Sequence, residues 1–128
     1  GMLQKEVAER ICAAPGTRSR GILSVLLQAW YDCEYLFTVE PFVFSPPPKV
    51  RSGVLRLVRN SRTDLGVDPA AFRRVVKTAF GQRRKTLRNS LSSLMAPGSA
   101  ALGSALLSER PERLSVEQFI ELTALISR

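Results

Sequence analysis

The sequence of 128 residues contains no histidine and only two cysteines, Cys12 and Cys33. The absence of histidine excludes Ser-His-Asp triads, histidine-based zinc sites and the commonest general base. The cysteines lack CxxC spacing, so we expect two reduced, buried thiols and neither a metal site nor a disulfide. Nothing in this composition activates a nucleophile by itself.

Long hydrophobic runs and glycine-rich phosphate loops are also missing. The longest nearly apolar run, Gly21 to Trp30, is interrupted by Ser24 and Gln28 and is too short to span a bilayer. Charged residues from Lys5 onward break up the N-terminus before any apolar signal-peptide core could form. No GxGxxG or Walker-type loop occurs. We therefore expect a cytoplasmic protein with no membrane partner.

Acidic residues are absent between Asp68 and Glu109, and this window holds most of the excess charge of a chain whose formal net charge is +8. A basic face without counter-charge suits a polyanion, because each neutralised phosphate also releases condensed counterions. We predict contact with nucleic acid here, against two alternatives, a merely solvated helix face and a membrane surface. The basic residues of the window are Arg73, Arg74, Lys77, Arg83, Arg84, Lys85 and Arg88.

The same window has helical periodicity. Apolar residues recur at i, i+3, i+4 and i+7 from Pro69 to Phe80, which predicts a helix with its basic residues on the opposite face. Asp68 would be its N-cap and Pro69 its first residue. A second helix is predicted from Thr86 to Leu94, and the joint between the two, Gly81 to Lys85, carries three consecutive basic residues.

The rest of the chain is predicted to contain few strands. Helices are expected within 3–14 and 22–31, strands at 34–39 and 53–59, and a last helix after a capping box of Ser115 and Gln118. The polar stretch Asn60 to Val67 is a candidate boundary. Two strands are too few for a stable sheet, and both have apolar residues on both faces, as in strands of a larger sheet.

The connection between the strands contains the run Pro46-Pro47-Pro48, which stiffens the backbone and removes amide donors. Phe44 precedes this run and Lys49 follows it. An aromatic ring held beside a stiff, basic loop suits stacking on an extruded base while the adjoining backbone is gripped. The alternative is that Phe44 is a core residue below the loop.

Several segments of the sequence resemble a known protein family. EYLFTVEPFVFSPPPKVRSGVLRLVRN is similar to the end of the catalytic domain in the RsmA (KsgA) family of small-subunit rRNA dimethyladenosine transferases. VVKTAFGQRRKTLRNSL and RPERLSVEQFIEL resemble that family's helical C-terminal domain. The resemblance extends over essentially the whole chain.

The resemblance implies an rRNA methyltransferase of ribosome biogenesis. It would transfer methyl groups from S-adenosylmethionine to N6 of two adjacent adenines in 16S rRNA of the small (30S) subunit. Its catalytic domain would be Rossmann-like, with the last two strands antiparallel. The resemblance further implies that Phe44 stacks on the target adenine, that Pro46, Pro47 and Lys49 shape the loop, and that the seven basic residues of the window meet rRNA.

The family's glycine-rich cofactor loop and its N-[LI]-P-Y catalytic motif are not in this sequence. We therefore expect a C-terminal fragment that is inactive alone, because the full-length parent and not this chain would bind S-adenosylmethionine. The expected fold is α+β and mostly helical. Residues 1–60 would be the end of a methyltransferase domain with its last strand pair, and residues 61–128 a small all-α rRNA-binding domain.

A stand-alone RNA-binding or ribosome-assembly module without chemistry is the alternative. The two interpretations differ in what they predict for the sheet. A fragment leaves apolar sheet surface exposed and is prone to homo-oligomers or strand exchange, whereas a complete module covers its strands with its own chain.

Overall fold

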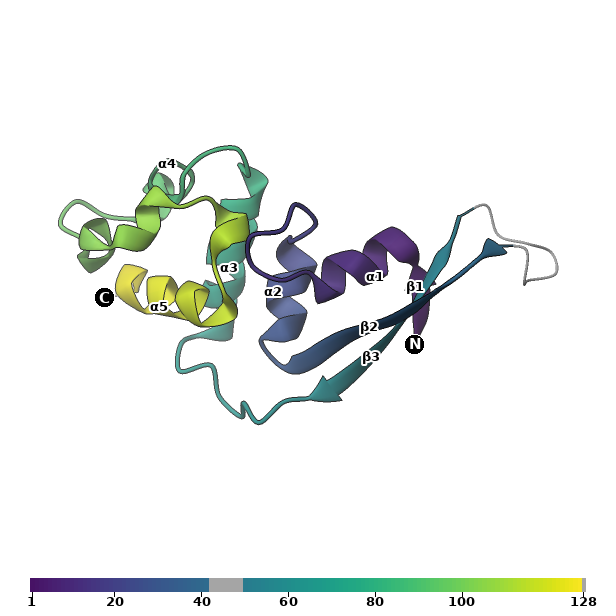
Figure 1. Cartoon of the computed structure of the whole chain (residues 1–128). Coiled ribbons are helices and arrows are strands. Elements are labelled where there is room, and N and C mark those ends of the chain that lie inside the picture. Colours follow the sequence, from purple (N-terminus) through teal and green to yellow (C-terminus); the bar gives the residue numbers. More distant parts are fainter. Residues whose placement is uncertain (42–49, 128) are drawn as a thin grey trace.

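The computed structural model describes residues 1–41 and 50–127. In these residues the chain is α+β, with a small antiparallel sheet at one end and a group of helices at the other (Figure 1). No described helix has the length and apolar character needed to cross a membrane. The strands are β1 (Met2–Gln4), β2 (Tyr31–Val39) and β3 (Ser52–Arg59), and the helices are α1 (Lys5–Cys12), α2 (Ile22–Gln28), α3 (Pro69–Gly81), α4 (Leu87–Ser90) and α5 (Val116–Ile126).

The sheet has a strand that the sequence interpretation missed. β2 and β3 form the expected antiparallel pair, which begins with Tyr31 opposite Arg59 and shifts register between Tyr35 and Phe37. β1 adds a third strand on the other edge of β3, in the order β1-β3-β2. Three residues are too few to display the alternation that identifies a strand, and the sequence predicts only a helix within 3–14 in this part of the chain.

Helix α2 ends at Gln28, before the predicted end at Tyr31. Side chains from beyond β3 bind its last carbonyl groups: Asn60 Nδ2 donates to the oxygens of Gln28 (3.4 Å) and Ala29 (3.3 Å), and Arg62 Nε donates to that of Ala29 (2.7 Å). These donors satisfy carbonyl groups that a continuing helix would have used. The chain is therefore free to enter β2 at Tyr31, earlier than the predicted Glu34.

The first two helices cover different parts of the molecule. α1 packs Ala8 and Ile11 on the sheet residue Leu55. This close approach requires Gly53, because a Cβ atom there would lie 2.8 Å from the Cβ of Ala8. α1 thus packs on the sheet, whereas α2 also joins the C-terminal helices.

The main core lies between α2 and the C-terminal helices. Val25 of α2 and Ala29, directly after its end, share it with Phe72 and Val76 of α3 and Phe119 of α5. Every one of these side chains is at most 2% exposed. Residues on both sides of position 60 therefore contribute to one core, and the division of the chain at that position stays a prediction.

The predicted C-terminal helices are mostly confirmed. α3 begins at Pro69, although the Asp68 side chain makes no capping hydrogen bond. The Ser115–Gln118 capping box is present in both directions, at 3.2 and 2.9 Å. The segment from Thr86 to Leu94 is not one helix but α4 followed by a 3₁₀ turn. There the Ser92 hydroxyl donates to the Asn89 carbonyl (3.0 Å), which competes with α-helical pairing.

The loop between α1 and α2, residues 13–21, is held in place by a buried arginine. Arg20 is 0% exposed; its Nε donates to the Leu114 carbonyl (3.0 Å), and its Nη1 to the Ala13 carbonyl (2.9 Å) and Gln28 Oε1 (3.0 Å). Burial lowers the pKa of Arg20, and the charge of Glu117 partly offsets this effect. Among the described residues no carboxylate pairs with it directly. Neutral oxygens therefore replace the water that the guanidinium loses.

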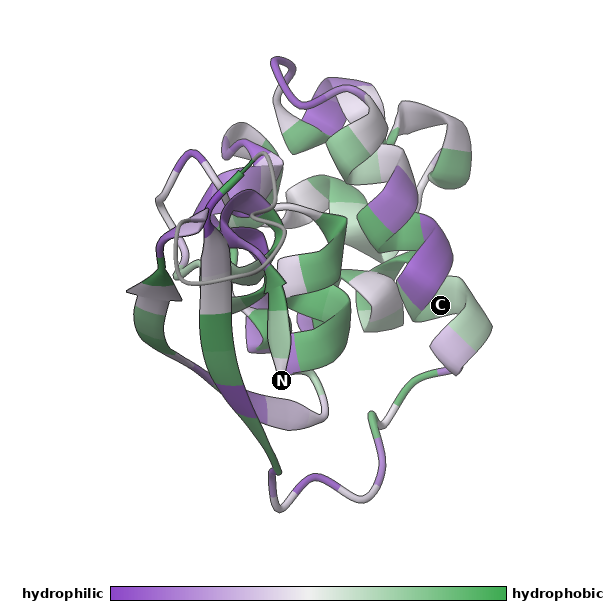
Figure 2. Cartoon of the chain, turned by 90° about the vertical axis from the view of Figure 1, so that its right-hand side faces the viewer, coloured by the Kyte–Doolittle hydropathy of each residue, from purple (hydrophilic) through white to green (hydrophobic). Residues whose placement is uncertain are grey.

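One side of the sheet is open. In Figure 1, α1 lies along one side of the strands, and no other described element covers the opposite side. Figure 2 shows hydrophobic stretches along these strands, and Phe37 is 56% exposed. β2 is also an edge strand within the described sheet. Other large apolar side chains left exposed on or beside the strands are Met2, Leu3, Leu36, Val50, Leu57 and Val58.

Candidate nucleic-acid interface

Helix α3 presents three of the predicted basic residues to solvent. Its apolar residues, among them Phe72 and Val76, are buried in the main core, so the opposite face points outward. Arg73, Arg74 and Lys77 lie on that outward face and are exposed. The sequence interpretation of this helix as half core and half basic surface is confirmed.

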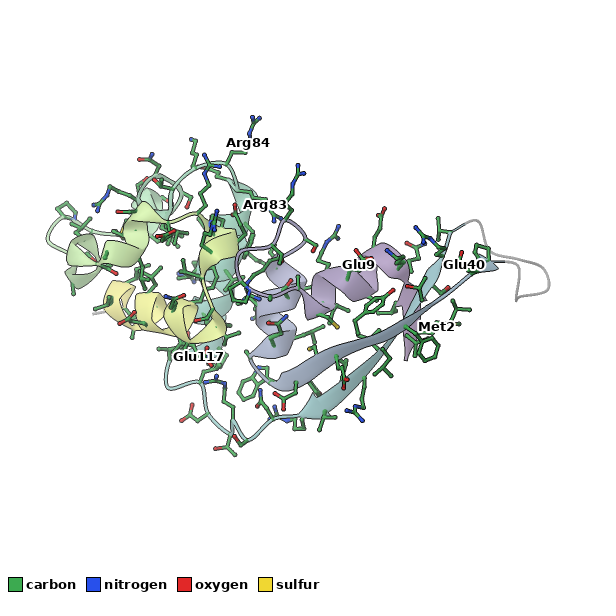
Figure 3. All side chains as sticks on the ribbon, in the orientation of Figure 1. Met2, Glu9, Glu40, Arg83, Arg84 and Glu117 are labelled. Atoms are coloured by element: carbon green, nitrogen blue, oxygen red, sulfur yellow. The ribbon has the colours of Figure 1, made fainter. Side chains whose placement is uncertain are left out.

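The turn between α3 and α4 carries three of the other four, Arg83, Arg84 and Lys85, and α4 carries Arg88. Arg84, Lys85 and Arg88 are exposed, and Figure 3 shows Arg84 extending away from the body of the molecule. The cluster Arg83 to Lys85 follows the C-terminal end of α3, where the helix dipole favours positive charge. The fold can therefore hold three consecutive cations here without a carboxylate beside them.

Arg83 differs from its neighbours because it also contacts the protein. Its side chain is partly buried, and the guanidinium carbon lies 5.8 Å from the centroid of the Phe80 ring. Its Nη2 donates a hydrogen bond to the backbone carbonyl of Arg18, in the loop between α1 and α2. Sequence reasoning did not link Arg18 to this surface, because the two arginines are 65 positions apart.

The ion pairs of the described residues all lie elsewhere. They join Lys5 to Glu9, Arg51 to Glu40, Arg56 to Glu34 and Arg62 to Glu117. None of the seven basic residues of α3, the turn and α4 takes part in them. The positive charge of this surface is thus not neutralised within the described part of the chain, as a polyanion-binding surface requires.

The predicted base-stacking loop lies outside the described residues. Phe44, Pro46, Pro47 and Lys49 all belong to residues 42–49. The chain on either side of them is described: Glu40 Oε1 lies 3.8 Å from Arg51 Nη1, and the amide of Lys5 donates to the Arg51 carbonyl (2.9 Å). A solvent-open cavity of about 590 Å³ adjoins this place, between Glu40, Arg51 and the start of α1.

The basic residues of α3, the turn and α4 lie apart from the described flank of the predicted stacking loop. Figure 3 shows Glu40, next to the predicted stacking loop, at the far end of the sheet from Arg83 and Arg84. The structure brings the basic residues of α3, the turn and α4 together but does not bring them to the flank of the loop. An RNA that contacted both regions would have to extend along the molecule.

The described residues do not fit S-adenosylmethionine. β1 runs directly from Gln4 into Lys5 of α1 with no glycine-rich turn, and the connection from β3 to α3 has a single glycine, Gly66. A dinucleotide-type site needs a glycine-rich strand-to-helix turn so that the backbone can approach the ligand. No catalytic step can be derived for this cofactor from these residues.

Two acidic residues and two thiols do not form a catalytic group either. Asp32 and Glu34 are exposed on β2, as expected for a solvated strand, and Glu34 Oε2 pairs with Arg56 Nη2 at 2.7 Å. Burial raises the pKa of the Cys12 and Cys33 thiols, with smaller contributions from nearby acidic groups. Both cysteines are free and half-buried, and a raised pKa keeps them protonated and unreactive near neutral pH.

Comparison with known proteins identifies the family. The family model "Ribosomal RNA adenine dimethylase" matches residues 2–127. Ribosomal RNA small subunit methyltransferase A of Parabacteroides distasonis is 59% identical over 125 residues, 98% of this chain and 47% of that protein. The Bacteroides fragilis protein of the same name is 58% identical over 123 residues, 96% of this chain and 45% of its own length.

A solved structure agrees in fold. A dimethyladenosine transferase from Plasmodium falciparum superposes with a TM-score of 0.76 at 20% identity, over 94% of this chain and 54% of that one. The chain spans about half the length of the curated relatives it matches. The resemblance inferred from the proline-rich loop and the basic turn is confirmed, and the chain belongs to the ribosomal RNA adenine dimethylase family.

Proposed function

We propose that the protein is an S-adenosylmethionine-dependent rRNA methyltransferase that dimethylates N6 of two adjacent adenines of small-subunit rRNA in the cytoplasm. Residues 61–128 form its rRNA-binding domain. Residues 1–60 are the end of a Rossmann-like methyltransferase domain that carries the base-stacking loop. The observation that supports RNA docking is the basic surface of α3, the turn and α4, whose cations have no ion-paired carboxylate among the described residues.

Within this function the basic surface and the predicted stacking loop have different roles. The basic surface binds the rRNA backbone by charge, while Phe44 stacks on the target adenine, with Pro46, Pro47 and Lys49 shaping its loop. Phosphate contacts fix orientation, and base contacts select the reacting nucleotide. This chain supplies docking and stacking but not the methyl donor, because its sequence lacks the cofactor loop and the N-[LI]-P-Y motif.

A methyl-transfer assay tests the proposal. Labelled S-adenosylmethionine and small subunits that lack the adenine methylation are incubated with the full-length enzyme or with this chain. We expect dimethyladenosine with the full-length enzyme only. Incorporation by this chain well above background would contradict the assignment of its role. The chain alone should still bind the same subunits, with an affinity that falls steeply as salt rises.

Substitution of the predicted stacking residue, Phe44→Ala, is expected to lower turnover of the full-length enzyme roughly tenfold while changing rRNA affinity less than twofold. The reason is that base stacking contributes about 1–3 kcal/mol, and here it would hold the adenine in the reacting position. Single-turnover rates and equilibrium binding, measured in parallel, separate the two effects. Phe44→Tyr keeps the ring and serves as the control. Equal single-turnover rates for Phe44→Ala and the unsubstituted enzyme would favour the alternative that Phe44 is a core residue.

The open sheet is expected to make this chain self-associate. Exposed apolar side chains such as Phe37 and the unpaired edge of β2 favour pairing between copies. Light scattering should show a mass that rises with protein concentration, and Phe37→Ser with Leu36→Lys should restore a monomer. Monodisperse monomer at high concentration would instead favour the docking-only module, whose strands were expected to be covered.

A further inference from the structure

The loop between α1 and α2 lies against the basic turn between α3 and α4. The contact is the hydrogen bond from Arg83 Nη2 to the Arg18 carbonyl. Figure 1 shows this loop next to α3, although most of the sheet separates the two segments in the sequence. Arg18 is exposed. The loop therefore adds a cation to a surface that was predicted from residues 73–88 alone.

The backbone of this loop is fixed at several points. The amide of Gly16 donates to the Glu112 carbonyl (2.7 Å), and Arg20 Nε donates to the Leu114 carbonyl (3.0 Å). Gly16 has a φ of 91°, a conformation that favours glycine. Since both flanks of Arg18 are tied to the segment before α5, its side chain starts from a defined position next to the turn. A cation on a fixed backbone loses less conformational entropy when it binds a ligand.

Repulsion between the positive charges in this region lowers the stability of the free protein. The backbone of Arg18 lies beside the Arg83 guanidinium, Arg84 and Lys85 follow Arg83 in the chain, and none of the four takes part in an ion pair with a described carboxylate. Like charges held together repel one another and lower the stability of the folded chain. A bound polyanion removes that repulsion, so this arrangement of charges favours the bound state.

We propose that Arg18 and the 13–21 loop form a second part of the RNA-binding surface. Arg83 fastens this loop to the turn, and Arg18 contacts an RNA phosphate beside those contacted by Arg84 and Lys85. The RNA backbone then crosses the junction between the helices and α1, which leads toward the sheet. The inference rests on the proposed function and extends its binding surface beyond the seven basic residues of α3, the turn and α4.

The test measures binding of the chain to small ribosomal subunits that lack the adenine methylation, at several salt concentrations. Arg18→Gln should weaken binding about fivefold and reduce the slope of log affinity against log salt by about 1, the effect of one lost phosphate contact. Arg18→Lys should restore the slope. Arg83→Gln should weaken binding by more than the loss of one phosphate contact would, since Arg83 positions the loop. The variant that combines Arg18→Gln and Arg83→Gln should lose less binding free energy than the sum of the two single losses.

Arg56→Gln is the matched control, because Arg56 is an exposed arginine on β3 that pairs with Glu34. It should leave the affinity and the slope unchanged. If Arg84→Gln weakens binding and Arg18→Gln does not, the inference is wrong while the proposed function stands. If neither substitution matters, both are wrong. Equal weakening of binding to anionic phosphatidylserine vesicles and to the subunits would also overturn it, because the site would then lack preference for RNA.

Discussion

Reversing two charges of the basic turn, with Arg83→Glu and Arg84→Glu, is expected to weaken binding to small-subunit rRNA about 100-fold near 0.1 M salt. Each substitution removes a cation and places a carboxylate next to the phosphates, in a region with no acidic residue between Asp68 and Glu109. The steepness of the salt dependence should fall by at least about 2, one unit for each substituted residue, and by more where the Arg18 loop loses its anchor. Filter binding or fluorescence anisotropy across a salt series measures both quantities.

The control for this variant is Arg56→Glu, which makes one such charge reversal, half the charge change of the double variant, at an exposed site on β3. A general loss of positive charge would affect both variants in proportion to the charge removed, whereas a local contact affects only the turn. Circular dichroism should show that the double variant keeps its helices, since Arg84 is exposed and contributes no core packing. Unchanged affinity in the double variant would show that the turn does not contact RNA.

Truncating the buried arginine, as Arg20→Ala, is expected to lower the free energy of unfolding by about 4 kcal/mol. The substitution leaves the Leu114 carbonyl and Gln28 Oε1 without the donor that they have in the structure, and it opens a cavity where a large side chain is 0% exposed. It also removes one of the two hydrogen bonds that tie the 13–21 loop to the segment before α5, since the Gly16 amide still donates to the Glu112 carbonyl. Urea denaturation followed by circular dichroism measures the loss.

Arg20→Met separates the two causes of this loss. Methionine fills most of the space but donates no hydrogen bond, so its cost should be about half that of alanine. A buried cation without an ion-pair partner is costly to desolvate, and its replacement by an apolar side chain recovers part of that cost. A loss below about 1 kcal/mol for Arg20→Ala would mean that these hydrogen bonds contribute little to stability.

Local patterns predicted the elements whose causes lie within a few residues. α3 follows from apolar spacing and Pro69, and the start of α5 follows from the Ser115–Gln118 capping box. The end of α2 could not be predicted in this way, because the donors that stop the helix, Asn60 and Arg62, come from beyond β3. The pairing of β1 with β3 is likewise a contact between distant residues, which a short segment cannot reveal by its own pattern.

The candidate site likewise has parts that local sequence predicts and parts that depend on contacts between distant residues. The basic residues of α3, the turn and α4 were evident because charge without counter-charge is visible in the sequence itself. The distinct position of Arg83, which reaches across to the Arg18 carbonyl, depends on the packing of two loops that are 65 positions apart in the chain. The stacking role of Phe44 came only from the proline-rich motif and stays a prediction, since it lies outside the described residues.

The position of α2 within the C-terminal core has a consequence for how the chain folds during synthesis. Val25 and Ala29 are buried with Phe119 and Leu122, so this core has high contact order and cannot close until α5 has left the ribosome. Until then the nascent chain exposes the apolar side of α2. A nascent chain released before α5 is made would therefore keep this apolar surface exposed and be prone to aggregate.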